Sequence, residues 1–327
     1  MKDLEDLYGQ TTERILVTCA LPYVNNVPHL GNMVPILSAD VYSRYLRLKE
    51  IPSIYICATD EHGTRTEMEA SKKGVGEEEY CADLHRKMLE IFQWFHVDFD
   101  HFGRTSCEQN HQLTQSIFGA LEKNGYVLDE ENEQLYDLEA EMYLPDTYVT
   151  GTCPYCSNSE AQGDQCDVCG RLLDPLELIS PKSKVSGATP EKRSTRHLFL
   201  RLDLLSPKIK SWLEAQEHWE GIIKNQPLGW IAEGMRPRAI TRDLKWGVKV
   251  PREGFQDKVF YVWFDAPIGY IAATAEWAEK EGVVLEDWWK SEKSRVIHFL
   301  GKDNVPFHTI MWPATLIGSD QGWSLPY

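Results

Sequence analysis

The order of apolar runs in the first sixty residues is the feature that most constrains the fold. Residues 14–21 form a short apolar run rich in β-branched side chains, and residues 53–58 form a second. Between them, apolar residues recur at helical spacing from Gly31 to about Lys49. Strand, loop, helix and strand in this order begin a doubly wound parallel sheet, so the sequence predicts an α/β protein.

The same alternation continues along the chain and is interrupted once. The predicted further elements are helices at about 77–95, 111–124 and 269–281, and strands at 258–264 and 295–300. Between about Tyr126 and Ile240 the chain shows short strand-like pieces (134–137 and 196–200), few long helices and a cysteine box. We therefore predict two halves of one catalytic domain, residues 1–125 and 240–327, separated by an inserted domain at 126–239.

Composition excludes several classes of protein. The chain has 327 residues, 42% of them hydrophobic, which is enough to bury a sizeable core. A formal charge of −16 argues against a surface that coats nucleic acid. The acidic N-terminus lacks the apolar run of a secretory signal, and no run approaches the length of a membrane span. We expect a cytoplasmic protein whose scattered cysteines are buried thiols.

Four cysteines form two Cys-x-x-Cys motifs inside the predicted insertion. The first is Cys153 with Cys156, the second is Cys166 with Cys169, and nine residues separate the two motifs. Four thiolates at this spacing form a tetrahedral zinc site, and no coordination position is left open for catalysis. The alternatives, two disulfides or chance clustering, fit a chain without an export signal less well. The sequence predicts one structural zinc in a zinc knuckle.

A turn at His29-Leu30-Gly31-Asn32 falls where the first strand gives way to a helix. Gly31 lets a nucleotide approach the backbone, and the helix N-terminus offers free amides to phosphate oxygens. His29 and Asn32 can add donors as charge develops at an α-phosphate. A histidine that merely caps the helix is the alternative. The position at the carboxyl end of a strand favours a nucleotide site.

The residues around this turn resemble a known family. Residues 18–32 closely resemble the signature loop of methionyl-tRNA synthetases, which are class I enzymes with a Rossmann-like domain. Four further segments look like the same family in the same order, namely 57–63, 239–247, 261–270 and 301–308, and the knuckle matches its connective insertion. The segment 239–247 is most similar to the eukaryotic cytosolic and archaeal branch. The resemblance covers about residues 14–327.

The resemblance implies a methionine site. The Asp60 carboxylate would bind the substrate ammonium by a charge-assisted hydrogen bond, helped by backbone groups near Leu21. Without the family match, Asp60 would be read as a helix N-cap, and Trp263 and Tyr270 as ordinary core aromatics. Aromatic edges suit the polarisable thioether of methionine. The implied slot consists of Leu21, Tyr23, Trp263, Ala266, Pro267, Tyr270, Phe307 and His308.

The resemblance also implies the reaction and its partners. His29, Gly31 and Asn32 would bind the ATP phosphates, Gly301 and Asp303 the ribose, and Arg242 would assist the reacting phosphates. Asp303 could instead be a simple turn residue. The methionine carboxylate attacks the α-phosphate of ATP, with Mg²⁺ bridging phosphates, and the methionyl group then passes to tRNA. The expected partners are L-methionine, ATP, tRNA and other synthetases of a multi-synthetase assembly, without DNA or membrane.

The sequence departs from the family pattern in two ways, and these departures suggest an alternative function. The class I signature ends in histidine, where this chain has Asn32, whose amide still donates a hydrogen bond. No Lys-Met-Ser-Lys-Ser sequence occurs in the chain, and the anticodon-binding helical domain of the family has no counterpart in it. The alternative function is therefore a catalytically incomplete module that binds methionine or tRNA, or that serves as a scaffold.

Overall fold

The computed structural model describes residues 13–145, 148–163, 166, 168–169 and 173–327, without the side chain of Asp303. The described chain divides into two compact units, residues 129–198 and the remainder. The larger unit contains a four-stranded parallel sheet in the order β13-β1-β2-β3. Its strands are β1 (Arg14–Cys19), β2 (Ser53–Thr59), β3 (His101–Arg104) and β13 (Ser294–Phe299). This sheet confirms the predicted α/β class.

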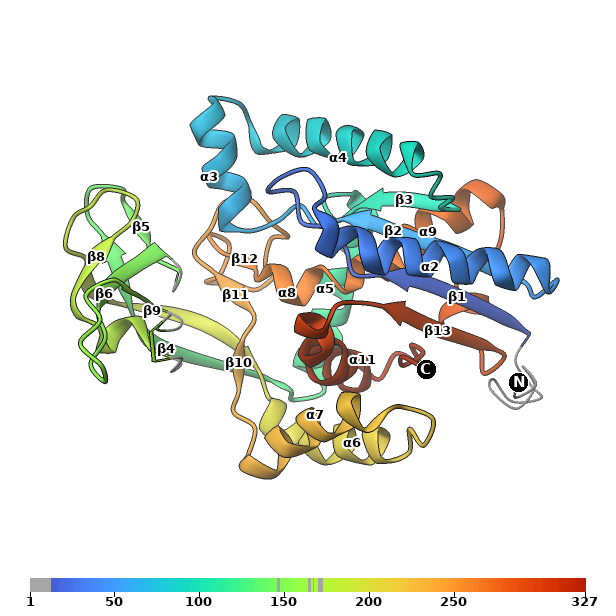
Figure 1. The fold of residues 1–327 in the computed structure, drawn as a ribbon. Helices are drawn as coiled ribbons and strands as arrows, with labels where there is room; N and C mark the ends of the chain where they lie inside the picture. The colour runs from blue at the N-terminus through green and yellow to red at the C-terminus, as the bar shows by residue number, and fades with distance from the viewer. Residues whose placement is uncertain (1–12, 146–147, 164–165, 167, 170–172) are drawn as a thin grey trace. The chain divides into compact units, whose positions relative to one another are not determined.

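Helices cover both faces of this sheet (Figure 1). The helix α2 (Leu30–Leu48) packs on β1 and β2 from one side, and α9 (Ile268–Glu281) packs on β2 and β3 from the other. The two central strands, β1 and β2, are buried along almost their whole length, as their apolar runs predict. The larger unit also contains α3 (Thr64–Lys73), α4 (Glu77–Trp94), α5 (Glu108–Lys123), α10 (Glu286–Trp289) and α11 (Trp312–Ser319), besides the three helices described below.

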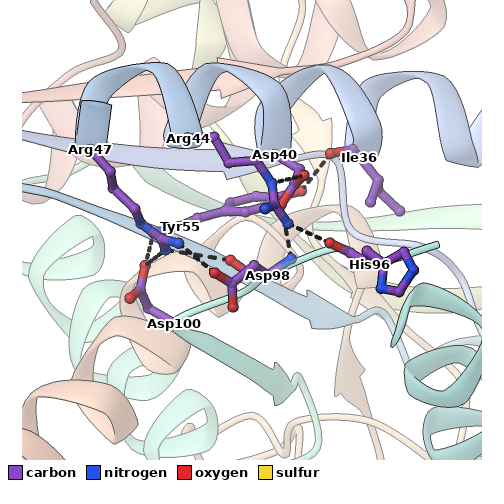
Figure 2. Close-up of polar contacts among 8 residues, drawn as sticks. All are labelled: Ile36, Asp40, Arg44, Arg47, Tyr55, His96, Asp98 and Asp100. Atoms are coloured by element: carbon purple, nitrogen blue, oxygen red, sulfur yellow. Dashed lines mark hydrogen bonds and ion pairs between the residues drawn. The ribbon is translucent and has the colours of Figure 1, made fainter. Parts of the chain in front are cut away.

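A polar network fastens α2 beside β2, as Figure 2 shows. Tyr55 of β2 donates its hydroxyl to a carbonyl of α2 at 3.0 Å. Arg47 of α2 reaches Asp98 and, at 2.9 Å, Asp100. Asp100 in turn accepts the Tyr55 amide at 2.7 Å, so one carboxylate joins helix and strand. These contacts fix the middle and the C-terminal end of α2 against the sheet. The residues drawn are Ile36, Asp40, Arg44, Arg47, Tyr55, His96, Asp98 and Asp100.

Two helices and one short strand differ from the sequence prediction. Residues 202–214 and 221–233 form α6 (Leu202–Glu214) and α7 (Gly221–Glu233), each with an internal proline that argues against a helix in sequence. The strand predicted at 258–264 is wrong. Only β12 (Val259–Phe260) forms there, antiparallel to β11 (Thr241–Arg242), and the chain then turns into α8 (Val262–Asp265). A short apolar run does not distinguish a strand from a buried helix.

The unit at residues 129–198 has its own core. It holds β5 (Met142–Tyr143), most of β4 (Val127–Asp137) and most of β9 (Glu191–Leu200), whose end pairs with β10 (Arg238–Ala239). A second sheet has the order β7-β6-β8, formed by Ala161–Gln162, Val149–Thr152 and Ile179–Ser183, beside the short turn η2 (Pro175–Glu177). The unit lies inside the segment 126–239. That the whole segment is one inserted domain stays a prediction.

Candidate functional site

The predicted nucleotide turn is the N-terminus of α2. His29 is the N-cap, and its Nδ1 accepts a hydrogen bond from the Gly31 amide at 3.0 Å. Asn32 completes a capping box, because its Oδ1 accepts from the His29 amide at 3.2 Å. The capping role that the sequence left as an alternative is therefore present in the structure. This capping role does not exclude nucleotide binding, because the two cap hydrogen bonds use only acceptor atoms of His29 and Asn32.

The cap leaves donor atoms directed away from itself. A neutral His29 that accepts at Nδ1 carries its proton on Nε2, and Asn32 keeps its amide protons. Both side chains are at least partly open to solvent. A Cβ on Gly31 would lie 2.8 Å from Cε1 of His29, so only glycine allows the imidazole to fold over the first turn. The turn therefore presents two side-chain donors together with free amides, which suits phosphate oxygens.

A cavity of about 80 Å³ lies beside this edge of the sheet. Nine residues were predicted for the methionine site, namely Asp60 and the eight residues of the slot. Eight of them line the cavity, and Ala20 and Asn304 complete the lining. Tyr23 is the exception. It pairs with Asp60 across the two loops that follow β1 and β2, and its hydroxyl accepts from Thr66 at 3.2 Å. The lining residues that were predicted are Leu21, Asp60, Trp263, Ala266, Pro267, Tyr270, Phe307 and His308.

Asp60 brings an uncompensated carboxyl group to this cavity. Its Oδ1 is buried and has no hydrogen-bond partner among the described residues. Burial raises the pKa of Asp60 well above its ordinary value, and the neighbouring carboxylates of Asp265 and Glu61 raise it further. Asp60 is not a helix cap, because α3 begins after Gly63. A cation entering the cavity would therefore meet a carboxylate without a partner.

The opposite wall of the cavity is neutral. His308 lies in a π-helical turn, residues 307–311, and its Nδ1 donates to the Asn304 carbonyl at 3.0 Å. Its Nε2 must therefore accept, and the Tyr270 hydroxyl donates to it at 3.0 Å. Burial lowers the pKa of His308 to about 4, so the ring is uncharged near neutral pH. Trp263 packs edge-on against Phe307 with ring centroids 4.2 Å apart.

Sequence reasoning gave no role to the buried charged residues that lie near Asp60. Glu61 is fully buried and accepts from Thr59 at 2.7 Å and from Arg104 at 2.9 and 3.1 Å. His62 contacts Asp265 at 2.6 Å, and this buried pair joins the loop after β2 to α8. Glu61, His62 and Asp265 lie inside the family-like segments 57–63 and 261–270, which was the signal available in the sequence. A second cavity, of about 400 Å³, adjoins Arg104, and none of the predicted site residues is among the described residues lining it.

The remaining predicted ATP residues lie on three elements. Gly301 follows β13, which is the parallel neighbour of β1, so it lies at the same edge of the sheet as the α2 turn. Asp303 lies in the short turn η3 (Lys302–Asn304), and its side chain is outside the described part of the chain. Arg242 lies on β11 with its guanidinium carbon 3.8 Å from the ring centroid of Tyr261.

The four knuckle cysteines come together in the smaller unit. Their sulfur atoms all lie within 4.8 Å of one another, with Cys153 and Cys169 at 3.9 Å and Cys156 and Cys166 at 3.6 Å. A tetrahedral zinc with bonds of about 2.3 Å separates its sulfurs by about 3.8 Å. The cluster therefore fits a structural zinc. Cys153 and Cys166 are buried in the core of the unit, which ties the cluster to its packing.

Comparison with known proteins adds a family. Residues 15–327 match the family model described as tRNA synthetases class I (M). Methionine--tRNA ligase 1 of Acaryochloris marina is 50% identical over 315 residues, which are 95% of this chain and 56% of that protein. The probable cytoplasmic methionine--tRNA ligase of Schizosaccharomyces pombe is 48% identical over 327 residues, 98% of this chain and 41% of that protein. The chain spans about half the length of the curated relatives it matches.

The fold is also similar to solved structures. The crystal structure of Mycobacterium tuberculosis methionyl-tRNA synthetase bound by methionyl-adenylate superposes with a TM-score of 0.70 at 22% identity. The match covers 96% of this chain and 56% of that one. At this identity the likeness supports the fold, which agrees with the predicted class I architecture. None of the helices in the described ranges combines the length and apolar content that crossing a membrane requires.

Proposed function

The chain belongs to the class I tRNA synthetase family designated M, and from this premise we propose that it is a methionine--tRNA ligase. The observation that supports this choice of substrate is the Asp60 carboxyl, which lines a cavity with aromatic walls and whose Oδ1 has no hydrogen-bond partner among the described residues. A substrate that fits needs a cationic group for the carboxylate and an apolar, polarisable side chain for the rings. Methionine has both.

The methionine ammonium binds Asp60 in this proposal. The thioether lies among Trp263, Phe307 and the Tyr270–His308 pair, whose single internal hydrogen bond satisfies both groups without a charge. Leu21, Ala266 and Pro267 complete the apolar wall, and Tyr23 anchors the loop that carries Leu21. The structure of the tuberculosis relative was solved with methionyl-adenylate, in line with this assignment.

ATP binds at the α2 turn in the same proposal. The donors of His29 and Asn32 and the amide of Gly31 take phosphate oxygens, Gly301 and Asp303 take the ribose, and Arg242 assists the reacting phosphates. The methionine carboxylate attacks the α-phosphate in line, which forms methionyl-adenylate and releases pyrophosphate. Mg²⁺ neutralises phosphate charge when bound. Transfer to the 3′ end of tRNA follows.

The knuckle binds one zinc, which stabilises the smaller unit and takes no part in the chemistry. We place residues 126–239 in the role of a connective insertion that guides the tRNA acceptor end. A cytoplasmic location follows the names of the relatives from Schizosaccharomyces pombe and Dictyostelium discoideum. The family resemblance also leads us to propose association with other synthetases in a multi-synthetase assembly.

Pyrophosphate exchange with each amino acid in turn tests the proposal. Exchange that requires methionine is the expected result. Exchange supported by a different amino acid would contradict the methionine assignment. No exchange, together with methionine binding in calorimetry, would favour the alternative of a catalytically incomplete module.

A further inference from the structure

The cavity of about 400 Å³ beside Arg104 has no role in the proposed reaction. It lies at β3, the edge strand of the parallel sheet, and α4 and α9 contribute to its walls. Its described lining belongs entirely to the larger unit and shares no residue with the described lining of the candidate methionine cavity. A cavity of this size is in the range of small-molecule sites. We call it the β3 cavity.

Arg104 brings a hydrogen-bond donor without an acceptor to the β3 cavity. Its Nε donates to the two carboxylate oxygens of Glu61 at 2.9 and 3.1 Å. Its Nη2 is buried and has no hydrogen-bond partner among the described residues. A buried N–H group without an acceptor is costly, so this position calls for an acceptor. A carboxylate suits it, because guanidinium and carboxylate groups form strong charge-assisted hydrogen bonds.

Two carboxylates in the same lining call for the opposite charge. Glu276 of α9 contacts Nε2 of His101 at 3.2 Å, and Glu78 of α4 has no ion pair within the described residues. A Cβ on Gly103 would lie 2.7 Å from Oε2 of Glu276, so glycine at this position lets the carboxylate approach β3. Burial lowers the pKa of His85, so its ring adds little positive charge near neutral pH. The two carboxylates therefore favour a ligand with a cationic group.

We propose that the β3 cavity binds a free α-amino acid as its zwitterion, with the carboxylate on Arg104 Nη2 and the ammonium group on Glu276. An anion alone would meet two carboxylates, and a cation alone would leave Nη2 without an acceptor. A zwitterion satisfies both groups at once. The cavity is not arranged for a metal ion, because the knuckle cysteines are the one group of three or more suitable ligands that the described residues bring together. This second site lies outside the proposed reaction and does not depend on it.

Nuclear magnetic resonance on the whole chain with isotope-labelled histidine tests this site. The rings of His85 and His101 line the cavity and report its occupancy locally. The standard amino acids other than methionine are added one at a time, with methionine present in excess to fill the other candidate site. The amino acid that binds best is then compared with its analogue without the ammonium group and with its analogue without the carboxylate.

Two variants on α9 complete the test. Glu276→Gln removes the charge that the ammonium group would bind. Glu279→Gln makes the same chemical change in the same helix and is the matched control, because Glu279 is not among the described residues lining the cavity. Both variants keep the size of the side chain, and the comparison of ligand analogues needs no variant.

We expect at least one amino acid to shift the resonances of His85 and His101 until they saturate. Loss of either charged group of the ligand, or Glu276→Gln, should weaken binding by about tenfold or more, as for a lost hydrogen bond to a charged group. Glu279→Gln should leave the affinity unchanged. The absence of saturable shifts, an analogue that binds as well as the amino acid, or equal weakening by the two variants would overturn the proposal. A chain that does not bind methionine would refute the proposed function but not this site, which the histidine shifts decide.

Discussion

Replacing Asp60 by asparagine separates a binding role from a structural one, because the two roles predict opposite changes in the melting temperature of the ligand-free protein. The amide has the size of the carboxylate but carries no charge. Burial and the nearby Asp265 and Glu61 carboxylates raise the pKa of Asp60, so its ionised form is disfavoured in the folded protein. Relative to the unfolded chain, this group costs stability above its ordinary pKa. Asp60→Asn should therefore raise the melting temperature of the ligand-free protein at neutral pH.

Methionine binding should change in the other direction. The ammonium group would be the partner that Asp60 Oδ1 lacks within the described structure. A hydrogen bond to a charged group contributes about 1.5–3 kcal/mol, so its loss should weaken methionine by about 10- to 150-fold. Isothermal titration calorimetry measures the affinity, and differential scanning calorimetry measures the melting temperature.

The adjacent residue provides a matched control. Glu61→Gln makes the same chemical change one residue along, but Glu61 is fully buried and bound by Arg104 and Thr59. Removing its charge leaves Arg104 without its carboxylate partner, which should lower stability by about 3–5 kcal/mol. If Asp60→Asn lowers the melting temperature as Glu61→Gln does, or binds methionine with unchanged affinity, the assignment of Asp60 is wrong.

Three other predictions test the remaining parts of the site. Gly31→Ala places a methyl group 2.8 Å from the His29 ring, so the cap should break at a cost of about 1 kcal/mol, with weaker ATP binding; an unchanged melting temperature would contradict this. Methionine affinity should fall as the pH is lowered from neutrality, already above the ordinary pKa of a carboxyl group, because burial raises the pKa of Asp60 and a proton on Asp60 competes with the ammonium; a flat calorimetric profile would argue against a raised pKa at Asp60. Cys166→Ser should abolish the one zinc per chain found by metal analysis and make residues 129–198 sensitive to protease, whereas an unchanged zinc content would exclude the knuckle as its site.

Local signals in the sequence predicted local structure well. The ends of β1 and β2 and the start of α2 agree with prediction within two residues, because a cap, a glycine and a periodic apolar stripe are all contained in one short segment. The same signals could not show which atoms of His29 the cap would use. That depends on a ring orientation, which Gly31 permits and which only coordinates reveal.

Non-local features were harder to predict. The cavity draws Leu21, Asp60, Trp263 and His308 from four segments spread over almost three hundred residues, and periodicity carries no information at that separation. Only the family resemblance grouped them. The buried His62–Asp265 pair was missed even though both residues lie inside the family-like segments 57–63 and 261–270, because the resemblance was used only for residues that would contact a substrate.

The electrostatics of the cavity give the strongest argument for its occupant. Asp60 lies near two other carboxylates, and of those two Glu61 already has Arg104 as its cation. The imidazoles beside the cavity do not supply a charge, because burial lowers the pKa of His298 well below its ordinary value and that of His308 to about 4. A fold that encloses a carboxyl group without a cation is incomplete by itself. Under the proposed function, an α-ammonium group would supply this cation, so an interaction that the ligand-free protein lacks would form only when an amino acid enters.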